Sequence, residues 1–128
     1  MAHQQDMGNW AEAQAVEWLQ AKGLRLLERN WRFKRAEIDI IAMDGRVMVF
    51  VEVKGRTGLG YGDPGERIDN TKKRLIIDAA GAYMRKTGHD WEIRFDIVTV
   101  LGGPGIGRHV RHYPDAFFPD LRFPTRRR

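Results

Sequence analysis

The sequence predicts a single α/β domain with a mixed central sheet of about five strands flanked by helices. Two patterns lead to this fold class. An Asp-Gly pair, Asp44-Gly45, joins two apolar segments of alternating residues, which is typical of a two-residue β-hairpin. Further on, a strand pattern is followed by a helix pattern and another strand pattern, an order that favours a parallel strand pair with a right-handed crossover. With 128 residues, the chain is long enough for one domain with a substantial core.

The individual elements follow from hydrophobic periodicity and from residues that begin or end helices. Asp6 is expected to cap a first helix that Gly23 ends, and Asn70 or Thr71 a second helix that Gly88 ends. In order, we expect a helix over 7–22, strands over 24–33, 37–43 and 46–54, a mobile loop over 55–67, a helix over 72–86, and strands over 91–101 and 108–113. Residues 1–113 would form the domain, and residues 114–128 a Pro- and Arg-rich tail.

Composition narrows the class of partner. The net charge of +5 and the pI near 9.9 favour a polyanion, with nucleic acid ahead of an acidic membrane surface. Cysteine is absent, which excludes disulfides, thiolate metal sites and a thiol nucleophile and fits a cytoplasmic location. No apolar run approaches the ~20 residues that a membrane span needs, and no signal-peptide pattern opens the chain. We therefore expect a cytoplasmic protein with no membrane partner.

The hairpin brings charged residues into an otherwise apolar ribbon. With Asp44 and Gly45 as the turn, Asp39 lies diagonal to Glu52 on one face, and Lys54 follows on the same face. Buried carboxylates need a partner, because an unpaired buried charge costs several kcal/mol. The spacing is equally compatible with a structural ion pair between Glu52 and Lys54 and with a cation site made by both acids.

The same register makes further predictions. It places Met43 opposite Arg46, and Glu37 opposite Glu52, where like charges repel unless a metal or an arginine lies between them. Either the strand is bulged at this point or Glu37 belongs to an outer shell. The opposite face is expected to be entirely core, with Ile38, Ile40, Ala42, Val47, Val49, Val51 and Val53.

Two other sets of polar residues bear on the site. Glu12 falls inside the apolar arc of the first helix, so its carboxylate either reaches water at the edge of the arc or points inward toward Asp39 and Glu52. His109 and His112 have no carboxylate nearby in the sequence and are expected to be surface histidines.

The ordered motifs resemble the bacterial YraN-like family. The match covers residues 8 to 100 and departs at Ala36, where the family usually has glycine. It rests on Gly8-x-x-Ala11-Glu12, Arg29-Asn30-Trp31-Arg32, Glu37-Ile38-Asp39-Ile40-Ile41, Phe50-Val51-Glu52-Val53-Lys54-x-Arg56, Lys72 with Ala80 and Tyr83, and Arg94-Phe95-Asp96.

This resemblance implies a restriction-endonuclease-like three-layer fold of the PD-(D/E)XK nuclease type, related to archaeal Holliday junction resolvases. On the matching positions it implies Asp39, Glu52 and Glu12 as ligands of Mg²⁺, or of Mn²⁺, and Lys54 as the catalytic lysine. Carboxylates are the ligands that such hard cations prefer, and Mg²⁺ keeps several waters. Basic residues near the site are expected to contact nucleic acid: Arg32, Lys34, Arg56, Lys72 and Lys73.

The function expected from these residues is that of a Mg²⁺-dependent endonuclease that binds and hydrolyses DNA. The alternative is a non-catalytic nucleic-acid-binding module that keeps the nuclease fold. A protein–protein adaptor with incidental basicity is a third class. By analogy with junction resolvases, a homodimer is expected.

Overall fold

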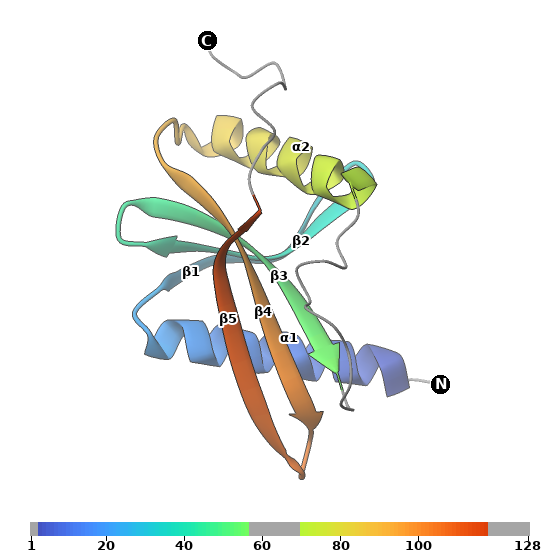
Figure 1. Cartoon of the computed structure of the whole chain (residues 1–128). Helices are drawn as coiled ribbons and strands as arrows, with labels where there is room; N and C mark the ends of the chain where they lie inside the picture. Colours follow the sequence, from blue (N-terminus) through green and yellow to red (C-terminus); the bar gives the residue numbers. More distant parts are fainter. Residues whose placement is uncertain (1–2, 57–69, 118–128) are drawn as a thin grey trace.

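The computed structural model describes residues 3–56 and 70–117, with the backbone alone for residues 3–7. Five strands form one sheet, and one helix covers each of its faces (Figure 1). This three-layer α/β architecture confirms the predicted fold class and is the arrangement expected of a restriction-endonuclease-like protein. The elements are α1 (His3–Ala21), β1 (Arg25–Phe33), β2 (Ala36–Asp44), β3 (Val47–Arg56), α2 (Asn70–Thr87), β4 (Ile93–Gly103) and β5 (Gly107–Phe117).

The sheet follows the chain, in the order β1-β2-β3-β4-β5. Strands β1, β2 and β3 form an antiparallel meander, β3 and β4 are parallel, and β5 returns antiparallel to β4. A parallel pair requires a crossover, and the segment that contains α2 makes it. The parallel pairing predicted between the strands on either side of the second helix is therefore confirmed.

Glycine ends both helices in the left-handed conformation. Gly23 has φ 101° and Gly88 has φ 75°. After α1, the Leu24 N–H donates to the Leu19 carbonyl and the Gly23 N–H to the Gln20 carbonyl, which is the hydrogen-bond pattern of a Schellman motif. The predicted helix ends are thus confirmed. The predicted start of the first helix is wrong, because α1 begins at His3 and Asp6 lies within it rather than capping it.

The predicted register of the β2–β3 hairpin is wrong. Met43 pairs with Met48, not with Arg46, and Asp44 pairs with Val47. The two turn residues are therefore Gly45 and Arg46. Gly45 has φ 61° whereas Arg46 does not have a positive φ, which fits a type II′ turn with glycine at its first central position. The prediction placed Asp44 and Gly45 at the two central positions of a type I′ turn, and so moved every pair by two residues.

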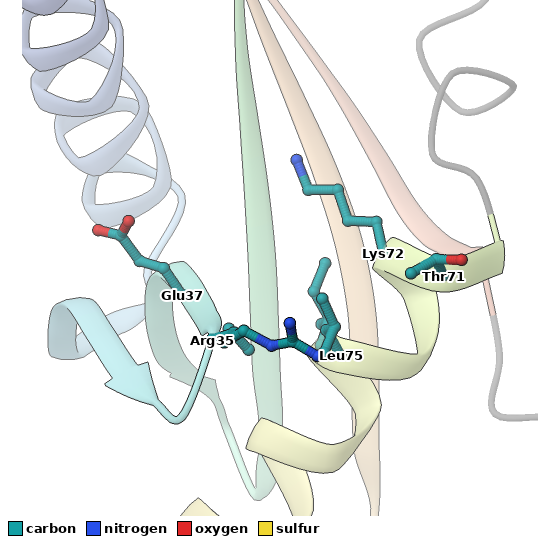
Figure 2. A pocket seen from close by; sticks show the side chains of 7 residues that line it. Arg35, Glu37, Thr71, Lys72 and Leu75 are labelled. Atoms are coloured by element: carbon teal, nitrogen blue, oxygen red, sulfur yellow. The ribbon is translucent and has the colours of Figure 1, made fainter.

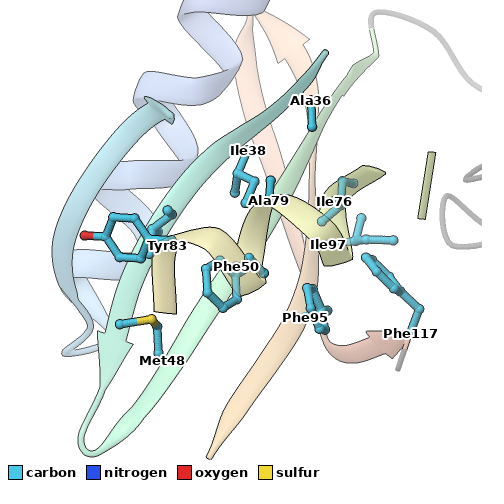
Figure 3. Close-up of a cluster of buried hydrophobic side chains, with 12 residues drawn as sticks. Ala36, Ile38, Met48, Phe50, Ile76, Ala79, Tyr83, Phe95, Ile97 and Phe117 are labelled. Carbon is cyan, nitrogen blue, oxygen red and sulfur yellow. The ribbon is translucent and has the colours of Figure 1, made fainter. Parts of the chain in front are cut away.

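Each face of the sheet carries its own hydrophobic cluster. The cluster under α2 contains Phe50, Phe95, Ile76 and Tyr83 (Figure 3). The cluster under α1 contains alanines and leucines of the helix packed on aliphatic residues of β2, β3 and β4: Ala11, Ala15, Leu19, Leu24, Ile40, Ala42, Val49, Val51, Val98 and Val100.

Ile38 corrects the predicted face of the second strand. It was expected beside Ile40, but it packs in the α2 cluster whereas Ile40 packs in the α1 cluster. Strict alternation would put both on one face, so the alternation is interrupted at Asp39. This irregularity lies at the centre of the candidate site.

The last strand extends beyond its predicted end. Instead of stopping at Tyr113, β5 runs through Pro114 to Phe117, and Phe117 is buried against Phe95. Pro114 fits because β5 is an edge strand, where the missing N–H breaks no ladder. The division of the chain into a domain and a tail stays a prediction, since residues 118–128 lie outside the described part. Residues 57–67 of the predicted mobile loop also lie outside it, whereas Gly55 and Arg56 of that loop belong to β3. No helix of the described residues is long and apolar enough to cross a membrane.

Gly102 supplies the first test of this fold. It has φ +114°, and a Cβ there would lie 2.1 Å from the Gly107 carbonyl oxygen across the β4–β5 ladder. We expect Gly102→Ala to lower the free energy of unfolding by about 2 kcal/mol more than Gly105→Ala does. Gly105 is the matched control, because its φ is +80° but nothing lies within 4 Å of an added Cβ. Urea unfolding of both variants measures the difference, and equal losses would contradict the close approach.

Candidate functional site

The candidate site lies where β2 and β3 separate. The last backbone pair between them is Ile40 with Val51. Beyond it, the Asp39 side chain takes the place of the backbone partner, and its Oδ2 accepts a hydrogen bond from the Val53 N–H at 2.8 Å. Glu52, between these two β3 residues, is only 7% exposed. The corrected register, continued by one pair, thus sets Asp39 level with Glu52 rather than diagonal to it.

The surroundings of Asp39 disfavour its negative charge. The pKa of Asp39 is raised to about 8, first by burial and then by the neighbouring charges of Glu52 and Glu12. The Val53 hydrogen bond and the Lys72 ammonium act in the opposite direction without cancelling the rise. A bound cation would stabilise the ionised form of this partly buried carboxyl group. Its positive charge would offset both the cost of burial and the repulsion by the neighbouring acids.

Two lysines reach Glu52. The Lys72 ammonium, from the first turn of α2, lies 2.5 Å from Glu52 Oε2, and that of Lys54 lies 3.9 Å from the same oxygen. Lys54 is the more enclosed of the two, with its side chain 14% exposed against 45% for Lys72. The predicted pair of Glu52 and Lys54 is present, but the shorter contact comes from α2.

The surroundings of Lys54 lower the pKa of its ammonium group. Burial lowers the pKa of its ammonium group, and the nearby positive charges of Lys72 and Arg56 lower it further, while Glu52 and Asp39 raise it. A lysine with a lowered pKa exchanges a proton more readily near neutral pH than a surface lysine does. Lys54 therefore can either stabilise a developing negative charge or take part in proton transfer.

Glu12 approaches the same region from α1. Its side chain is 16% exposed and is held by β1: Asn30 Nδ2 donates to Glu12 Oε1 at 2.9 Å, and Arg29 lies 3.7 Å from the same oxygen. The close contact between Ala11 and Gly55, where an added Cβ would lie 3.0 Å from Ala11 Cβ, keeps α1 near the end of β3. The Glu12 charge contributes to the raised pKa of Asp39, and an inward turn of its carboxylate toward Asp39 and Glu52 stays a prediction.

The donor set suits a hard cation with few protein ligands. Within residues 3–56 and 70–117, no three His, Cys, Asp or Glu side chains already surround one point as a metal site would. Asp39 and Glu52 alone fit Mg²⁺ or Mn²⁺, because such ions use one or two carboxylates and keep water on the remaining positions. Glu12 as a third ligand stays a prediction, because Asn30 and Arg29 hold its carboxylate here.

Glu37 does not face Glu52, contrary to the prediction. It pairs with Arg32 across β1 and β2, and the two side chains form an ion pair of 3.6 Å. Neither a metal nor a bulge opposite Glu52 is needed to accommodate it. Glu37 therefore belongs to the rim of the site.

The basic residues predicted to contact nucleic acid lie on three segments. Arg32 and Lys34 are at the β1–β2 connection, where Lys34 has φ 56° and its ammonium lies 5.3 Å from the Phe33 ring centroid. Arg56 ends β3 and donates to the Gly55 carbonyl at 3.1 Å. Lys72 and Lys73 begin α2, with Lys73 above the Phe117 ring. Sequence reasoning missed Arg35, which is exposed between Lys34 and the buried Ala36.

A second network of charged residues was not predicted, although Arg94 and Asp96 belong to a motif of the family resemblance. Asp96 is fully buried on β4 and accepts hydrogen bonds from Arg94, from the Asp115 N–H and from His112 Nε2 at 2.7 Å. The prediction that His112 is a surface histidine is wrong: its side chain is 7% exposed and packs edge-on against Trp18. These hydrogen bonds and the Arg94 charge hold the pKa of Asp96 below its usual value although burial opposes them.

Comparison with known proteins identifies the family. The model described as "Uncharacterised protein family UPF0102" matches residues 11–100. The chain belongs to the UPF0102 family. This confirms the resemblance to YraN-like proteins, and Glu12, Asp39, Glu52 and Lys54 all lie inside the matched range.

Individual UPF0102 proteins match over nearly the whole chain. One from Rhodococcus jostii is 41% identical over 118 residues, which are 91% of this chain and all of that protein. One from Flavobacterium psychrophilum is 40% identical over 92% of this chain and 98% of its own length. One from Chlorobaculum parvum is 44% identical over 84% of each. This UPF0102 chain is therefore similar to its relatives along its length and not only at the motifs.

Proposed function

We propose that this protein is a Mg²⁺-dependent nuclease that binds nucleic acid and hydrolyses DNA phosphodiester bonds. The observation that carries the proposal is the pairing of two acids, Asp39 and Glu52, with the enclosed Lys54 where β2 and β3 separate. Phosphodiester hydrolysis needs a hard cation at the phosphate and positive charge for the transition state. Those are the two requirements that this group of side chains can meet.

Each side chain has a role in the proposed reaction. Asp39 and Glu52 would hold Mg²⁺, which when bound supplies a Lewis acid for the scissile phosphate. Lys54, two residues after Glu52 on β3, would lie beside the phosphate, stabilise its added negative charge and orient the attacking water. Lys72, now paired with Glu52, would turn to a phosphate oxygen once a cation neutralises Glu52. Glu12 would act from the outer shell or as a further ligand.

One observation favours a second candidate, the non-catalytic nucleic-acid-binding module. The contact between Lys72 and Glu52 already neutralises one of the proposed ligands. In a protein that has ceased to cut, this ion pair would be permanent, and the basic residues would still hold phosphates. Such binding would weaken steeply with salt and would not depend on a divalent cation.

A cleavage assay separates the two candidates. We expect the wild type with Mg²⁺ or Mn²⁺ to cut linear, single-stranded, flapped or four-way-junction DNA. Lys54→Ala should lower the rate about 100-fold or more, because it removes the positive charge that would stabilise the negative charge of the transition state. Lys86→Ala, at the far end of α2, is the control and should cut at the wild-type rate. Cleavage that survives Lys54→Ala would show that the activity arises elsewhere. Salt-sensitive binding without any cleavage would favour the second candidate.

A further inference from the structure

A hollow of about 310 Å³ lies beside the candidate site, between the start of β2 and the first two turns of α2. Its lining is of two kinds. Ala36, Leu75 and Ile76 give an apolar wall, whereas Arg35, Glu37, Thr71 and Lys72 supply polar groups. The volume lies at the lower end of the range for small-molecule sites, so the hollow has room for one small unit of a ligand and not for a helical segment.

The charges around the hollow favour an anionic ligand. Figure 2 shows Arg35 reaching from the β1–β2 connection toward Leu75 of α2, with Lys72 on the next turn back along the helix. Within the part of the chain that the structure describes, Arg35 has no ion pair or hydrogen bond. An arginine that is not paired with a carboxylate is suited to bind a phosphate. The apolar wall beside it is suited to contact a base or a sugar.

Lys72 joins the hollow to the candidate metal site. It lines the hollow and at the same time reaches Glu52. A phosphate held by a cation at Glu52 would therefore have its neighbouring nucleotide at the hollow. The recess has room for a single nucleotide and not for a duplex. A base must therefore leave the stack of a duplex before it can enter the recess.

We infer that this hollow binds one unstacked nucleotide of a nucleic acid, with the base or sugar against Leu75 and Ile76 and the phosphate at Arg35 and Lys72. The inference rests on the proposed function, which it deepens by naming the substrate class: DNA with single-stranded or unpaired nucleotides next to the scissile phosphate. Contact of a base with an apolar or aromatic surface is sequence-tolerant, so no sequence preference is expected from it.

The test measures binding, in EDTA, so that it does not depend on cleavage. The wild type should bind a fluorescein-labelled single-stranded oligonucleotide about fivefold more tightly than the blunt duplex of the same strand, measured by fluorescence anisotropy. Leu75→Gln should weaken single-strand binding about fivefold, since it places a polar group in the apolar wall that would contact the base. Ile77→Gln is the matched control, because Ile77 is also partly buried on α2 and packs on the same cluster but does not line the hollow.

Equal affinities of Leu75→Gln and Ile77→Gln would overturn the inference even if the wild type cuts DNA. Conversely, the expected difference would support it even if no DNA is cut. Should Leu75→Gln fail to fold, the wild type still provides a test by ¹H–¹⁵N NMR with thymidine 5′-monophosphate and with inorganic phosphate. Larger shifts at Arg35, Ala36 and Leu75 with the nucleotide support the inference. Equal shifts with both probes would mean a simple anion site and would overturn it.

Discussion

Replacing Asp39 by asparagine is expected to abolish Mg²⁺-dependent DNA cleavage, with a loss of about 1,000-fold or more, while leaving the fold intact. The amide has the shape of the carboxyl group, and its oxygen can still accept the Val53 N–H. The substitution removes the negative charge that would hold the cation. Without the cation, the transition state loses Lewis-acid stabilisation of several kcal/mol, which accounts for the expected loss of rate. Rates of cleavage at saturating Mg²⁺ measure the loss.

The same substitution should change how stability depends on pH. The pKa of Asp39 is raised to about 8 in the folded protein from an ordinary value of 3.8, so between these values the folded protein holds a proton that the unfolded chain releases. Stability in EDTA therefore falls as the pH rises from about 4 to about 8. In Asp39→Asn this fall should be reduced, which urea unfolding at several pH values would measure. Mg²⁺ should raise the melting temperature of the wild type and not that of the variant.

Asp44→Asn is the control for both measurements, because Asp44 ends the same strand but pairs with Arg94 and lies outside the candidate site and the hollow. It should keep both the cleavage and the response to Mg²⁺. A variant Asp39→Asn that still cuts with Mg²⁺, or that is still stabilised by Mg²⁺, would place the metal elsewhere in the protein.

Loss of the Asp96 charge is expected to be the most destabilising single change outside the candidate site. Asp96→Asn leaves Arg94 and His112 buried or partly buried with their acceptor reduced, and breaking one partner of a buried charge network typically costs about 3–5 kcal/mol. Asp44→Asn is the matched control: Asp44 also binds Arg94, at 3.0 Å, but its side chain is 45% exposed. Exposed pairs contribute about 1 kcal/mol or less. Urea unfolding at pH 7 compares the two variants, and similar losses would contradict a central role for Asp96.

The contribution of Asp96 should also disappear in acid. Its pKa is lowered in the folded protein, so the stability it supplies is fully present above the ordinary pKa of about 3.8 and is lost as the pH falls below that value. The difference between wild type and Asp96→Asn should accordingly shrink between pH 5 and pH 3. A difference that does not change with pH would mean that the carboxylate acts by its shape and not by its charge.

Local signals predicted most of the fold. Glycines at 23 and 88 set the helix ends, because both positions need a positive φ. The order of strand, helix and strand predicted the parallel pair of β3 and β4. The hairpin register was missed because Asp44-Gly45 is compatible with two turns, and the sequence does not say whether glycine takes the first or the second central position. The register determines which side chains lie opposite one another. The wrong turn therefore also gave wrong neighbours for Glu37, Asp39 and Glu52 in the candidate site.

The residues of the candidate site stay a prediction, whereas their geometry differs from the predicted one. Asp39, Glu52, Lys54 and Glu12 came from motif spacing and family resemblance, and the structure brings their charges into mutual range. The role of Asn30 in holding Glu12 depends on a contact 18 residues away. His112 was missed for the same reason: its partner Asp96 is distant along the chain and meets it only when β5 pairs with β4. Such contacts depend on tertiary structure and leave no local pattern.

The topology of the sheet also orders events in folding. Asp39 and Glu52 belong to a hairpin whose ends are close along the chain, whereas the parallel ladder of β3 and β4 begins by joining residues 48 and 93. Closing the longer loop has the larger entropic cost and is slower. We therefore expect the two carboxylates to meet early, and α2 with Lys72 to dock on them later. During that interval Glu52 has Lys54 as a partner but not Lys72. If Asp39 and Glu52 hold a divalent cation as proposed, that cation present during refolding would accelerate the formation of the hairpin.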